Sequence, residues 1–517
     1  MKRIICILTA GVLILSAMMT AACGLIPSRP DTEESADSLT KPDQPAYTVT
    51  VVYPRDCGIL LSGGSALQTV THREDFVPIT VSTKGDYRYE GYEIDGVTYT
   101  DDTIRLPQDP TAPVTVNILV SRVMQEPPVI RIHTDGTPVD SKEYVDMTLS
   151  LTGTDSPLVN VGGEIRLRGN STYSLPKKPY RIKLDQKHSF FGLDKAKSWV
   201  LLADYLDPSA LHNYAALTLA GTSEYFDFVP TPYKVSLYLN DEYMGLYTLC
   251  EQIQEQEGRL DLECEITPDM TDARDFNFLI CMNYNAPEKP GAEEGVTYFY
   301  LSNCERYFEL EYPKREDFAS EEQFRAFFDS LESFIRDTSA AYLKGDLAYI
   351  KKHTDVNSLI DLFIIDEIMG ERDHHWKSFF LYYRGADGDG TDTDKLCFGP
   401  PWDYDFCMLC EWTGQPNEEY EIKNTLHEYE LNFFYQPLLS RTSLNKLVKS
   451  RYQNHFAAEL DRVIEQVQER ADTMPNALEQ NQERWYADKP TITEDNIEFF
   501  IRYLKARKAY LNRVWGA

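Results

Sequence analysis

A run of cationic residues between positions 166 and 183 lies in a chain that is otherwise strongly acidic. The 517 residues include 51 lysines and arginines against 82 aspartates and glutamates, which gives a net charge of −31. Alternation along Tyr180–Leu184 puts Arg181 and Lys183 on one face of a predicted strand. Gly169 and Ser171, in the preceding turn, allow a ligand to approach backbone amides, which can receive an anion. The segment has the groups that a polyphosphate needs; the alternative is a solvated basic strand paired with surface carboxylates.

Residues Glu371–Ser378 form a second polar cluster, directly after an apolar stretch that ends near Met369. An aspartate just past a helix end, here Asp373, can orient a nucleophilic hydroxyl and accept its proton. Ser378, five residues later, adds an oxygen that can lie near a metal. The alternative is a loop whose polar residues cap neighbouring elements.

Two carboxylates, Asp403 and Asp405, stand two residues apart in the segment Gly399–Phe406. If the backbone after the short predicted strand 396–398 is extended, both side chains face the same side. Carboxylate oxygens suit Mg²⁺, a hard ion that keeps several waters for substrate phosphates. Because an Asp-x-Asp pattern is common, a plain acidic loop is the alternative for this cluster.

Three further patterns are weaker candidates for metal sites. His374 and His375 are adjacent in sequence, and adjacent histidines rarely point the same way. Cys407 and Cys410 lack a second pair of cysteines or histidines for zinc, so a local disulfide or two buried thiols is the better interpretation. The acidic segment that begins at Asp387 lacks the glutamate that closes a calcium loop, because its twelfth position is Phe398, and we interpret residues 385–395 as a flexible acidic insertion.

The elements that must position these clusters come as strands first and helices last. Alternating apolar patterns predict strands near residues 129–133, 164–167, 180–184, 234–239 and 245–250. Helical periodicity and capping residues predict helices over about 208–220, 320–344, 355–369 and most of the chain from 437 onward. Asp207 and Pro208 form the predicted cap and first turn of the first helix, and Thr491 with Glu494 a capping box for the last. The pattern predicts one large α+β domain over residues 125–517.

The N-terminus has the order of a bacterial lipoprotein signal peptide. Lys2 and Arg3 precede a mostly apolar run, Ile4–Met19, and small residues then lead to Cys23. We predict that residues 1–23 are the signal peptide, with cleavage before Cys23 and lipidation of its thiol, so that the protein is anchored to the membrane outside the cytoplasm. A plain signal anchor is the alternative, but the apolar run is short for a span of about 20 residues. Export would let the remaining cysteines oxidise, in a pattern that the sequence leaves open.

Residues 24–124 contain no candidate catalytic cluster. Residues 24–46 are rich in Pro, Ser, Thr and acidic side chains, which predicts a flexible linker. Alternating strands near 47–53, 77–81, 87–94 and 114–120 predict a small all-β module over residues 47–124, serving as a spacer or weak adhesion module. The acidic charge of the chain repels phosphate backbones, which argues against a nucleic-acid partner. The same charge suits a basic protein partner, or simply solubility.

Four sequence blocks, in this order, resemble the CotH family of atypical protein kinases. The first runs from Glu164 to Ala220 and includes RLRGNSTYSLPKKPYRIKL. The others are EYMGLYTLCEQI at 242–253, MGERDHHWKSFFLYY at 369–383 and GPPWDYDF at 399–406. The resemblance spans roughly residues 125–515. It implies an atypical two-lobed protein-kinase-like fold, ATP and Mg²⁺ as cofactors, and transfer of the γ-phosphate to Ser or Thr of an extracytoplasmic protein.

The resemblance also implies roles for individual residues. Lys183 would contact the nucleotide phosphates, and Glu251 would orient that lysine. Asp373 would be the catalytic aspartate near the acceptor hydroxyl. The nucleotide would further be bound by Arg168, Asn170 and Arg181, and the metal by Asp403, Asp405 and Ser378.

Two positions depart from the family pattern. Ser378 stands where the family usually carries a metal-binding asparagine, and serine is a shorter and weaker ligand. His212 stands where an arginine is expected. The alternative function is therefore a catalytically weak or inactive CotH-like surface lipoprotein with a binding or structural role. A third reading is a transferase that adds phosphate or a nucleotidyl group to a small molecule or glycan.

Overall fold

The computed structural model describes residues 45–53, 59–83, 87–122, 126–385, 394–408, 425–487 and 496–516. Contacts between Cα atoms divide the chain into two compact units: one holds the residues up to Val120 apart from 86–88, and the other holds residues 86–88 and those from Ser121 onward. Several predicted features lie outside the described residues, namely the signal peptide with Cys23, most of the linker, the acidic insertion after Gly385, Cys410, Thr491 and Glu494. The domain boundaries inferred from sequence remain predictions.

The first unit is built mainly of strands. Its described part forms two sheets with strand orders β3-β1-β8-β5-β6 and β2-β4-β7. The strands are β1 (Tyr47–Val52), β2 (Ile59–Gly63), β3 (Leu67–Val70), β4 (Ile79–Thr83), β5 (Tyr87–Ile94), β6 (Val97–Tyr99), β7 (Thr103–Ile104) and β8 (Val114–Arg122). Alternate residues enter the core, as Val49 and Val51 of β1 show. The strands predicted from alternation in this region are confirmed.

Seven strands of the second unit close into a barrel of order β10-β11-β12-β13-β15-β14-β9. They are β9 (Val129–His133), β10 (Val145–Thr152), β11 (Leu158–Leu167), β12 (Tyr180–His188), β13 (Ala196–Leu202), β14 (Tyr233–Leu239) and β15 (Glu242–Glu251). Ile165 and Ile182 pair across β11 and β12 and are fully buried in the barrel core. Arg166 and Arg181 pair one position away and therefore face outward. The predicted placement of Arg181 and Lys183 opposite Ile182 is confirmed.

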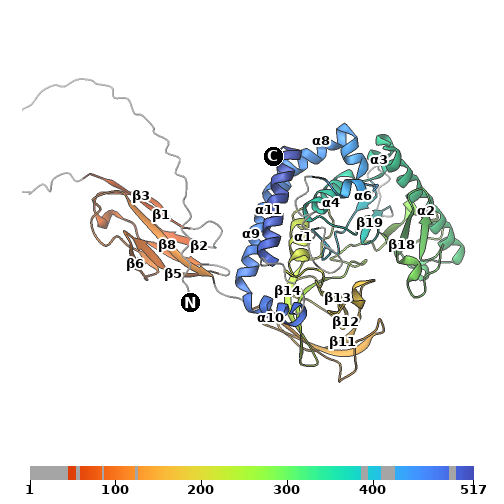
Figure 1. The fold of residues 1–517 in the computed structure, drawn as a ribbon, viewed down its shortest axis with the longest axis horizontal. Helices are drawn as coiled ribbons and strands as arrows, with labels where there is room; N and C mark the ends of the chain where they lie inside the picture. Colours follow the sequence, from red (N-terminus) through yellow and green to blue (C-terminus); the bar gives the residue numbers. More distant parts are fainter. Residues whose placement is uncertain are drawn as a thin grey trace, which may run out of the picture. The chain divides into compact units, whose positions relative to one another are not determined.

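A five-stranded sheet of order β17-β18-β16-β19-β20 forms the other β layer of this unit (Figure 1). Its strands are β16 (Asn277–Met282), β17 (Tyr298–Leu301), β18 (Arg306–Tyr312), β19 (Phe379–Arg384) and β20 (Cys397–Phe398). Central strand β16 is buried along its whole length. Phe278 of β16 stacks on Tyr383 of β19, with ring centroids 5.4 Å apart, and packs against Phe334 of a covering helix.

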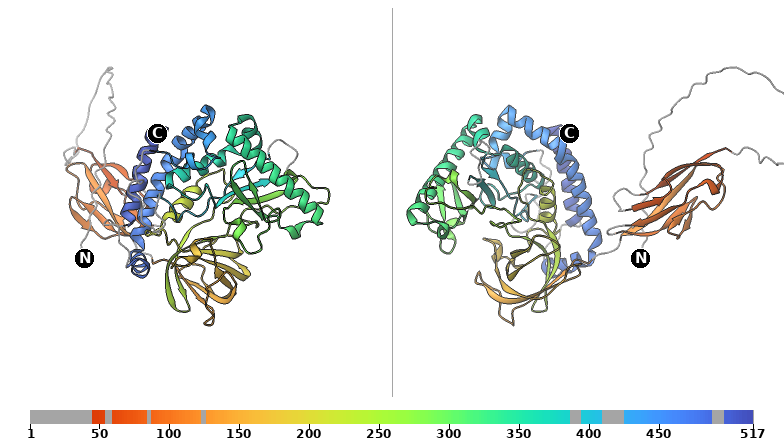
Figure 2. Two further views of the ribbon diagram at one scale, coloured as in Figure 1. Left: turned by 45° about the vertical axis from the view of Figure 1, so that its right-hand side comes forward. Right: turned by 180° about the vertical axis from the view of Figure 1, so that it is seen from behind.

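Helices dominate the C-terminal half of the second unit, as predicted. They are α1 (His212–Ala220), α2 (Glu321–Lys344), α3 (Leu347–His353), α4 (Val356–Met369), α6 (Glu428–Leu431), α7 (Gln436–Ser440), α8 (Thr442–Arg451), α9 (Ala457–Thr473), α10 (Pro475–Tyr486) and α11 (Asn496–Trp515). Ser320 caps α2 by accepting a hydrogen bond from the Gln323 N–H at 3.1 Å, which confirms its predicted start. Helices α9 and α11 pack side by side (Figures 1 and 2).

Helix α4 is the element that presents the second polar cluster. Every residue from Ser358 to Met369 is buried, as expected for a helix that is apolar on all sides. The helix ends at Gly370, whose φ of 60° lies in the left-handed region that favours glycine at this position. The chain then turns into the loop that contains Asp373.

The predicted start of the first helix is wrong by four residues, because α1 begins at His212 rather than at Pro208. The Asp207 carboxylate accepts hydrogen bonds from the N–H groups of Ser209 at 2.8 Å and His212 at 2.6 Å. Asp207 thus satisfies the free N–H groups at the start of the helix from the far side of an intervening turn. Asp207 was correctly predicted to accept backbone N–H groups near the start of this helix. Its sequence context does not show whether the next residues form a separate turn or the first turn of the helix.

The fold is therefore mixed α/β, with a barrel and a second sheet in one unit; the kinase-like two-lobed arrangement stays a prediction. Within the described ranges, no helix is long and apolar enough to cross a membrane. The cysteines in these ranges form no disulfide with one another.

Candidate functional site

A cavity of about 470 Å³ lies in the second unit between the outer face of the barrel and the five-stranded sheet. Arg166 and Arg181 line it from the barrel, together with the turn 168–172 that joins β11 to β12. Glu309 of β18 lines it from the sheet, and the segments that carry Ser378 and Asp403 complete the lining. The volume falls within the range of about 300–1,000 Å³ that is usual for small-molecule sites.

The charge of this cavity is opposite to that of the chain. Among its described lining residues, six are cationic, and they are Lys142, Arg166, Arg168, Arg181, Lys289 and Lys377. Four are carboxylates, and they are Glu143, Glu309, Glu311 and Asp403. Burial, followed by repulsion from Lys289, Arg166 and Arg168, lowers the pKa of Lys142. Cations crowded closely enough to disfavour one another's charge are a site for an anion.

Asp373 and Lys377 form an ion pair within one tight turn after α4. The carbonyl of Asp373 accepts the N–H groups of Trp376 at 2.7 Å and Lys377 at 2.8 Å. This turn returns the Lys377 Nζ to the Asp373 carboxylate at 2.9 Å. Burial raises the pKa of Asp373, and Lys377 opposes that rise. Burial alone would lower the pKa of Lys377, but Asp373, Asp403 and Asp405 hold it above its ordinary value.

Asp403 and Asp405 also lie close enough to Lys377 to raise its pKa, and Ser378 follows Lys377 in the chain. The Ser378 hydroxyl donates to Asp403 Oδ2 at 3.0 Å. The predicted extended backbone is wrong here, because Asp403 has a φ of 70° and the chain turns at this point. Both aspartates nevertheless line a second, small cavity of about 10 Å³ together with Arg168. Burial, then repulsion from Asp403 and Asp204, raises the pKa of Asp405 well above its usual range.

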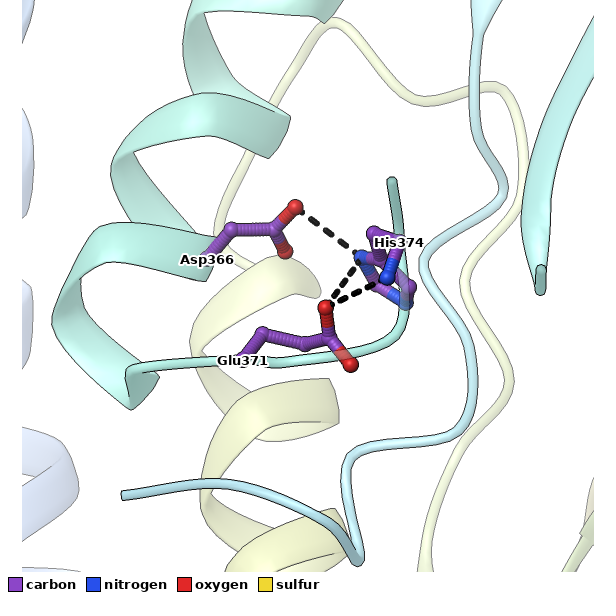
Figure 3. Close-up of side chains that lie close together, drawn as sticks. All are labelled: Asp366, Glu371 and His374. Carbon is purple, nitrogen blue, oxygen red and sulfur yellow. Dashed lines mark hydrogen bonds and ion pairs between the residues drawn. The ribbon is translucent and has the colours of Figure 1, made fainter. Parts of the chain in front are cut away.

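Asp366, Glu371 and His374 form a buried network (Figure 3). It is hydrogen-bonded both to the loop that contains Asp373 and to the segment Trp402–Asp403. His374 Nδ1 lies 2.9 Å from Asp366 Oδ2, and its Nε2 lies 2.7 Å from the carbonyl of Trp402. Both partners can only accept, so both ring nitrogens donate and His374 is an imidazolium. Burial alone would lower the pKa of His374, but Asp366 and Glu371 raise it to about 10.

These three residues come close enough together to hold a metal ion, but their bonds argue against one. Glu371 accepts the N–H groups of Asp373, at 2.7 and 2.8 Å, and of His374, at 2.7 Å. Asp366 accepts the hydroxyls of Tyr404, at 2.9 Å, and Tyr435, at 2.5 Å. With no lone pair left on His374, the network is a clamp that joins the Asp373 loop to the Trp402–Asp403 segment.

A second buried network fixes the same segment to α1. Asn213 accepts the Tyr404 N–H at 2.8 Å and donates to Asp204 Oδ1 at 2.8 Å. Asp204 also forms an ion pair with buried Lys234 at 2.9 Å and accepts the Thr248 hydroxyl at 2.6 Å. The position of Asp403 therefore depends on α4, α1 and the barrel together.

The structure brings together most of the residues predicted from sequence. Arg168, Asn170, Arg181, Ser378 and Asp403 line the 470 Å³ cavity. Asp405 joins them through the small cavity that it shares with Arg168 and Asp403. Asp373 joins them through Lys377, which lines the large cavity and pairs with Asp373.

Two predicted residues, Lys183 and Glu251, are not brought together. Lys183 is half-exposed, pairs with Glu164 at 3.6 Å, and is not among the described residues that line the cavity. Glu251 accepts the Thr231 N–H at 2.8 Å. In the strand register, Lys183 of β12 lies opposite Ser198 of β13, whereas Glu251 of β15 lies opposite Trp199 of β13. Because neighbouring residues of a strand face opposite sides, the register puts Lys183 and Glu251 on opposite faces of the barrel wall.

Lys177, which belongs to the same cationic run, joins elements of the fold rather than lining the 470 Å³ cavity. It is fully buried, and its Nζ donates to the Leu246 carbonyl at 2.7 Å and to Asn481 Oδ1 at 2.9 Å. It therefore ties the turn before β12 to β15 and α10. Burial lowers its pKa to about 7.

Sequence reasoning gave no role to Lys377, the buried cation that pairs with Asp373 and interacts with Asp403. Lys377 stands four residues after Asp373 in the block 369–383, but the sequence does not show that this lysine is buried. Sequence reasoning also missed Lys142, Lys289, Glu309 and Glu311, which come from parts of the chain without a recognised motif. Lys289 lies 2.6 Å from Glu309 and 4.0 Å from Glu311. Only tertiary structure brings these residues to the cavity.

A cation-lined cavity that adjoins paired carboxylates, within a mixed α/β domain, is typical of proteins that handle phosphate groups. The family model described as CotH kinase protein matches residues 165–511, about two thirds of the chain, and the protein belongs to this family. A search of the curated proteins found no match.

Proposed function

We propose that this protein is an exported, lipid-anchored kinase that transfers the γ-phosphate of ATP to a Ser or Thr hydroxyl of an extracytoplasmic protein. One observation carries the proposal: six cations line a single cavity of a chain with a net charge of −31, directly beside Asp403 and Asp405. Family membership supports kinase chemistry. The two-lobed kinase-like arrangement, with the nucleotide between the barrel and the second sheet, is part of this proposal.

The acidic pair is suited to a divalent cation. Asp403 and Asp405 offer carboxylate oxygens, the donors that Mg²⁺ prefers. Burial, followed by repulsion from Asp403, raises the pKa of Asp405, and a bound cation would relieve that repulsion. Magnesium at this position would neutralise charge on the transferred phosphate.

The protein's own residues then divide the remaining work. Arg168 and Arg181 hold the phosphates by charge-assisted hydrogen bonds. Asp373 orients the acceptor hydroxyl and takes its proton as the acceptor oxygen bonds to the γ-phosphorus, while the bond from that phosphorus to the β-phosphate oxygen breaks and ADP leaves. Lys377 opposes the rise in the pKa of Asp373 that burial causes, and it places positive charge between Asp373 and Asp403.

Replacing Asp403 with Asn tests the metal part of the proposal. The change removes one of two carboxylates while keeping the side-chain volume and an oxygen for Ser378. We expect Mg-dependent ATP affinity, measured by calorimetry, to fall at least tenfold, of the order seen when metal-site residues are altered. ATP binding without Mg²⁺ should change little.

The matched control is Asp337→Asn, which lies on the exposed face of α2 and is not among the described residues that line the cavity. It should leave both affinities unchanged. Equal Mg-dependent affinities for wild type and Asp403→Asn would contradict the proposed metal site.

Membrane anchoring rests on the lipoprotein-like N-terminus and is tested separately. In cells fed an alkyne-labelled fatty acid, we expect the full-length chain to become labelled and to fractionate with membranes. Cys23→Ser should abolish the label and release the protein from the membrane fraction. A chain that stays labelled after this change carries its lipid elsewhere.

Ser378 supports the alternative of a surface binding or structural lipoprotein with little or no activity. Its hydroxyl is hydrogen-bonded to Asp403, and it is a weaker metal ligand than the asparagine usual in the family. Absence of any Mg-dependent nucleotide binding by the wild-type protein would favour this alternative. The mass added to an acceptor after reaction separates phosphate transfer from nucleotidyl transfer.

A further inference from the structure

We propose that a third cavity, which lies beside Asp373, is an acceptor subsite that takes a large apolar side chain, preferably aromatic, from the polypeptide being phosphorylated. The inference rests on the proposed function for its acceptor class. It adds a specificity that neither the family assignment nor the catalytic residues supply.

This cavity has a volume of about 500 Å³ and is lined by Ser171, Tyr284, Asp373, Trp376, Lys377 and Phe406. Ser171 and Lys377 also line the 470 Å³ cavity, so the two cavities adjoin. Asp373 thus faces a cavity that is distinct from the cation-lined cavity and adjoins it. A hydroxyl that approaches Asp373 through this space would meet a phosphate held in the other.

Three aromatic rings form the walls, and the proposed chemistry uses none of them. Trp376 is 45% exposed and Tyr284 is 44% exposed, among the most exposed large rings in the described residues. A backbone hydrogen bond from the Tyr284 N–H to the Trp376 carbonyl, at 3.0 Å, fixes these two walls side by side. Exposed tryptophan and tyrosine in a concave site are typical of binding surfaces.

The local charge selects against a basic side chain, in spite of the acidity of the whole chain. Arg306 lies over the Trp376 ring at 4.3 Å, and Arg372 lies over the Phe406 ring at 5.4 Å. Arg306 donates to the backbone carbonyls of His375, Cys304 and Glu305, and the Glu305 carboxylate partly offsets its charge.

Lys377 adds a third cation, and it already neutralises the one carboxylate of the cavity, Asp373. A lysine or arginine side chain that enters this cavity would be repelled by these cations, and the described lining offers it no carboxylate other than Asp373. An uncharged aromatic side chain would bury apolar surface against three rings.

The spacing of a polypeptide sets the position of this side chain. The acceptor hydroxyl must reach Asp373, which itself lines the cavity. Consecutive residues of an extended chain advance about 3.3–3.6 Å each. The apolar side chain should therefore lie one to three residues from the acceptor.

The test compares three peptides that differ only two residues after a single serine, where they carry Phe, Ala or Lys. With the full-length protein and Mg²⁺ with a non-hydrolysable ATP analogue, anisotropy of labelled peptides gives Kd. With Mg-ATP, initial rates give kcat/KM. We expect the Phe peptide to bind about tenfold tighter than the Ala peptide, the equivalent of about 1.4 kcal/mol, and the Lys peptide weakest.

Trp376→Ala should remove the preference for Phe over Ala. Because the ring is half-exposed, its truncation should leave the fold intact, and unchanged Mg-ATP affinity would confirm this. The matched control is Tyr300→Ala, another exposed ring of the second unit, 38% exposed and outside both cavity linings. It should keep the full preference.

The outcomes separate this inference from the proposed function. A Phe preference in Kd that Trp376→Ala abolishes supports the subsite, even if no phosphate is transferred and the kinase proposal fails. Phosphate transfer without a Phe preference, or with a Lys preference, overturns the subsite and leaves the kinase. Trp376-dependent binding of soluble oligosaccharides without peptide binding overturns it in favour of a glycan acceptor.

Discussion

Replacing Asp373 with Asn should lower kcat for phosphate transfer by about 10²- to 10⁴-fold, the range contributed by a positioned general base. The change keeps the size of the side chain but removes its negative charge and its ability to take a proton. Asp373 is also the ion-pair partner of Lys377 at 2.9 Å. Losing the pair leaves a buried cation, so the loop will be less stable as well as less active.

Binding of Mg-ATP separates the catalytic effect from a structural one. The phosphates are expected to contact Arg168 and Arg181, which are not bonded to Asp373, so Mg-ATP affinity should change by less than about threefold, or about 0.7 kcal/mol. Asp337→Asn on the exposed face of α2 serves as the matched control and should keep wild-type kcat. Wild-type turnover by Asp373→Asn would show that another group accepts the proton.

Replacing His374 with Gln should destabilise the second unit by about 3–5 kcal/mol, as expected when one partner of a buried ion pair is removed. His374 and Asp366 are buried, and their bond of 2.9 Å lies directly behind the site. The variant leaves the carboxylates of Asp366 and Glu371 without their cation. It also removes the 2.7 Å bond to the Trp402 carbonyl, so Asp403 should shift and Mg-dependent ATP binding should weaken.

The pH dependence of stability has a definite sign. The pKa of His374 is raised to about 10 in the folded protein, above the value of about 6.5 expected in the unfolded chain. The folded state therefore holds a proton that the unfolded state has released. The stabilisation is fully present below about pH 6.5 and is lost as the pH rises through about 10.

Urea unfolding at several pH values checks both statements. The stability difference between wild type and His374→Gln should be largest near pH 6 and should shrink steadily toward pH 10. His133→Gln is the matched control, because His133 forms an exposed pair with Asp241 at 3.8 Å and such pairs contribute little. In a double-mutant cycle with Asp366→Asn the losses should be less than additive, and full additivity would contradict the clamp.

The local elements could be predicted because their signals are local. The strands at Tyr47–Val52 and Val129–His133 follow from period-two alternation, and the buried helix Val356–Met369 from its apolar run and the glycine after it. The start of α1 could not be placed, because Asp207 serves a turn whose geometry depends on packing around it. Family membership was also readable from the order of four blocks, and the family model confirms it.

The site was predicted in its chemistry but not in its pairing. Arg168 and Arg181 belong to one sequence cluster and Asp403 to another, and the structure brings the three residues to one cavity. Lys183 was given the central role because the family resemblance implied it, and alternation placed it on one strand face with Arg181. Sequence cannot say how far along that face the cavity extends, and it ends before Lys183.

The sequence by itself determined which groups are available: a basic hairpin, an aspartate after a buried helix, and an acidic pair after a short strand. Tertiary structure alone decided which of them meet. Strand register put Lys183 and Glu251 on opposite faces, and a single turn of loop made Lys377 the buried cation between Asp373 and Asp403. Residue type and periodicity are properties of neighbouring positions, whereas burial and the meeting of charged groups such as Arg168 and Asp403 depend on segments far apart in the chain.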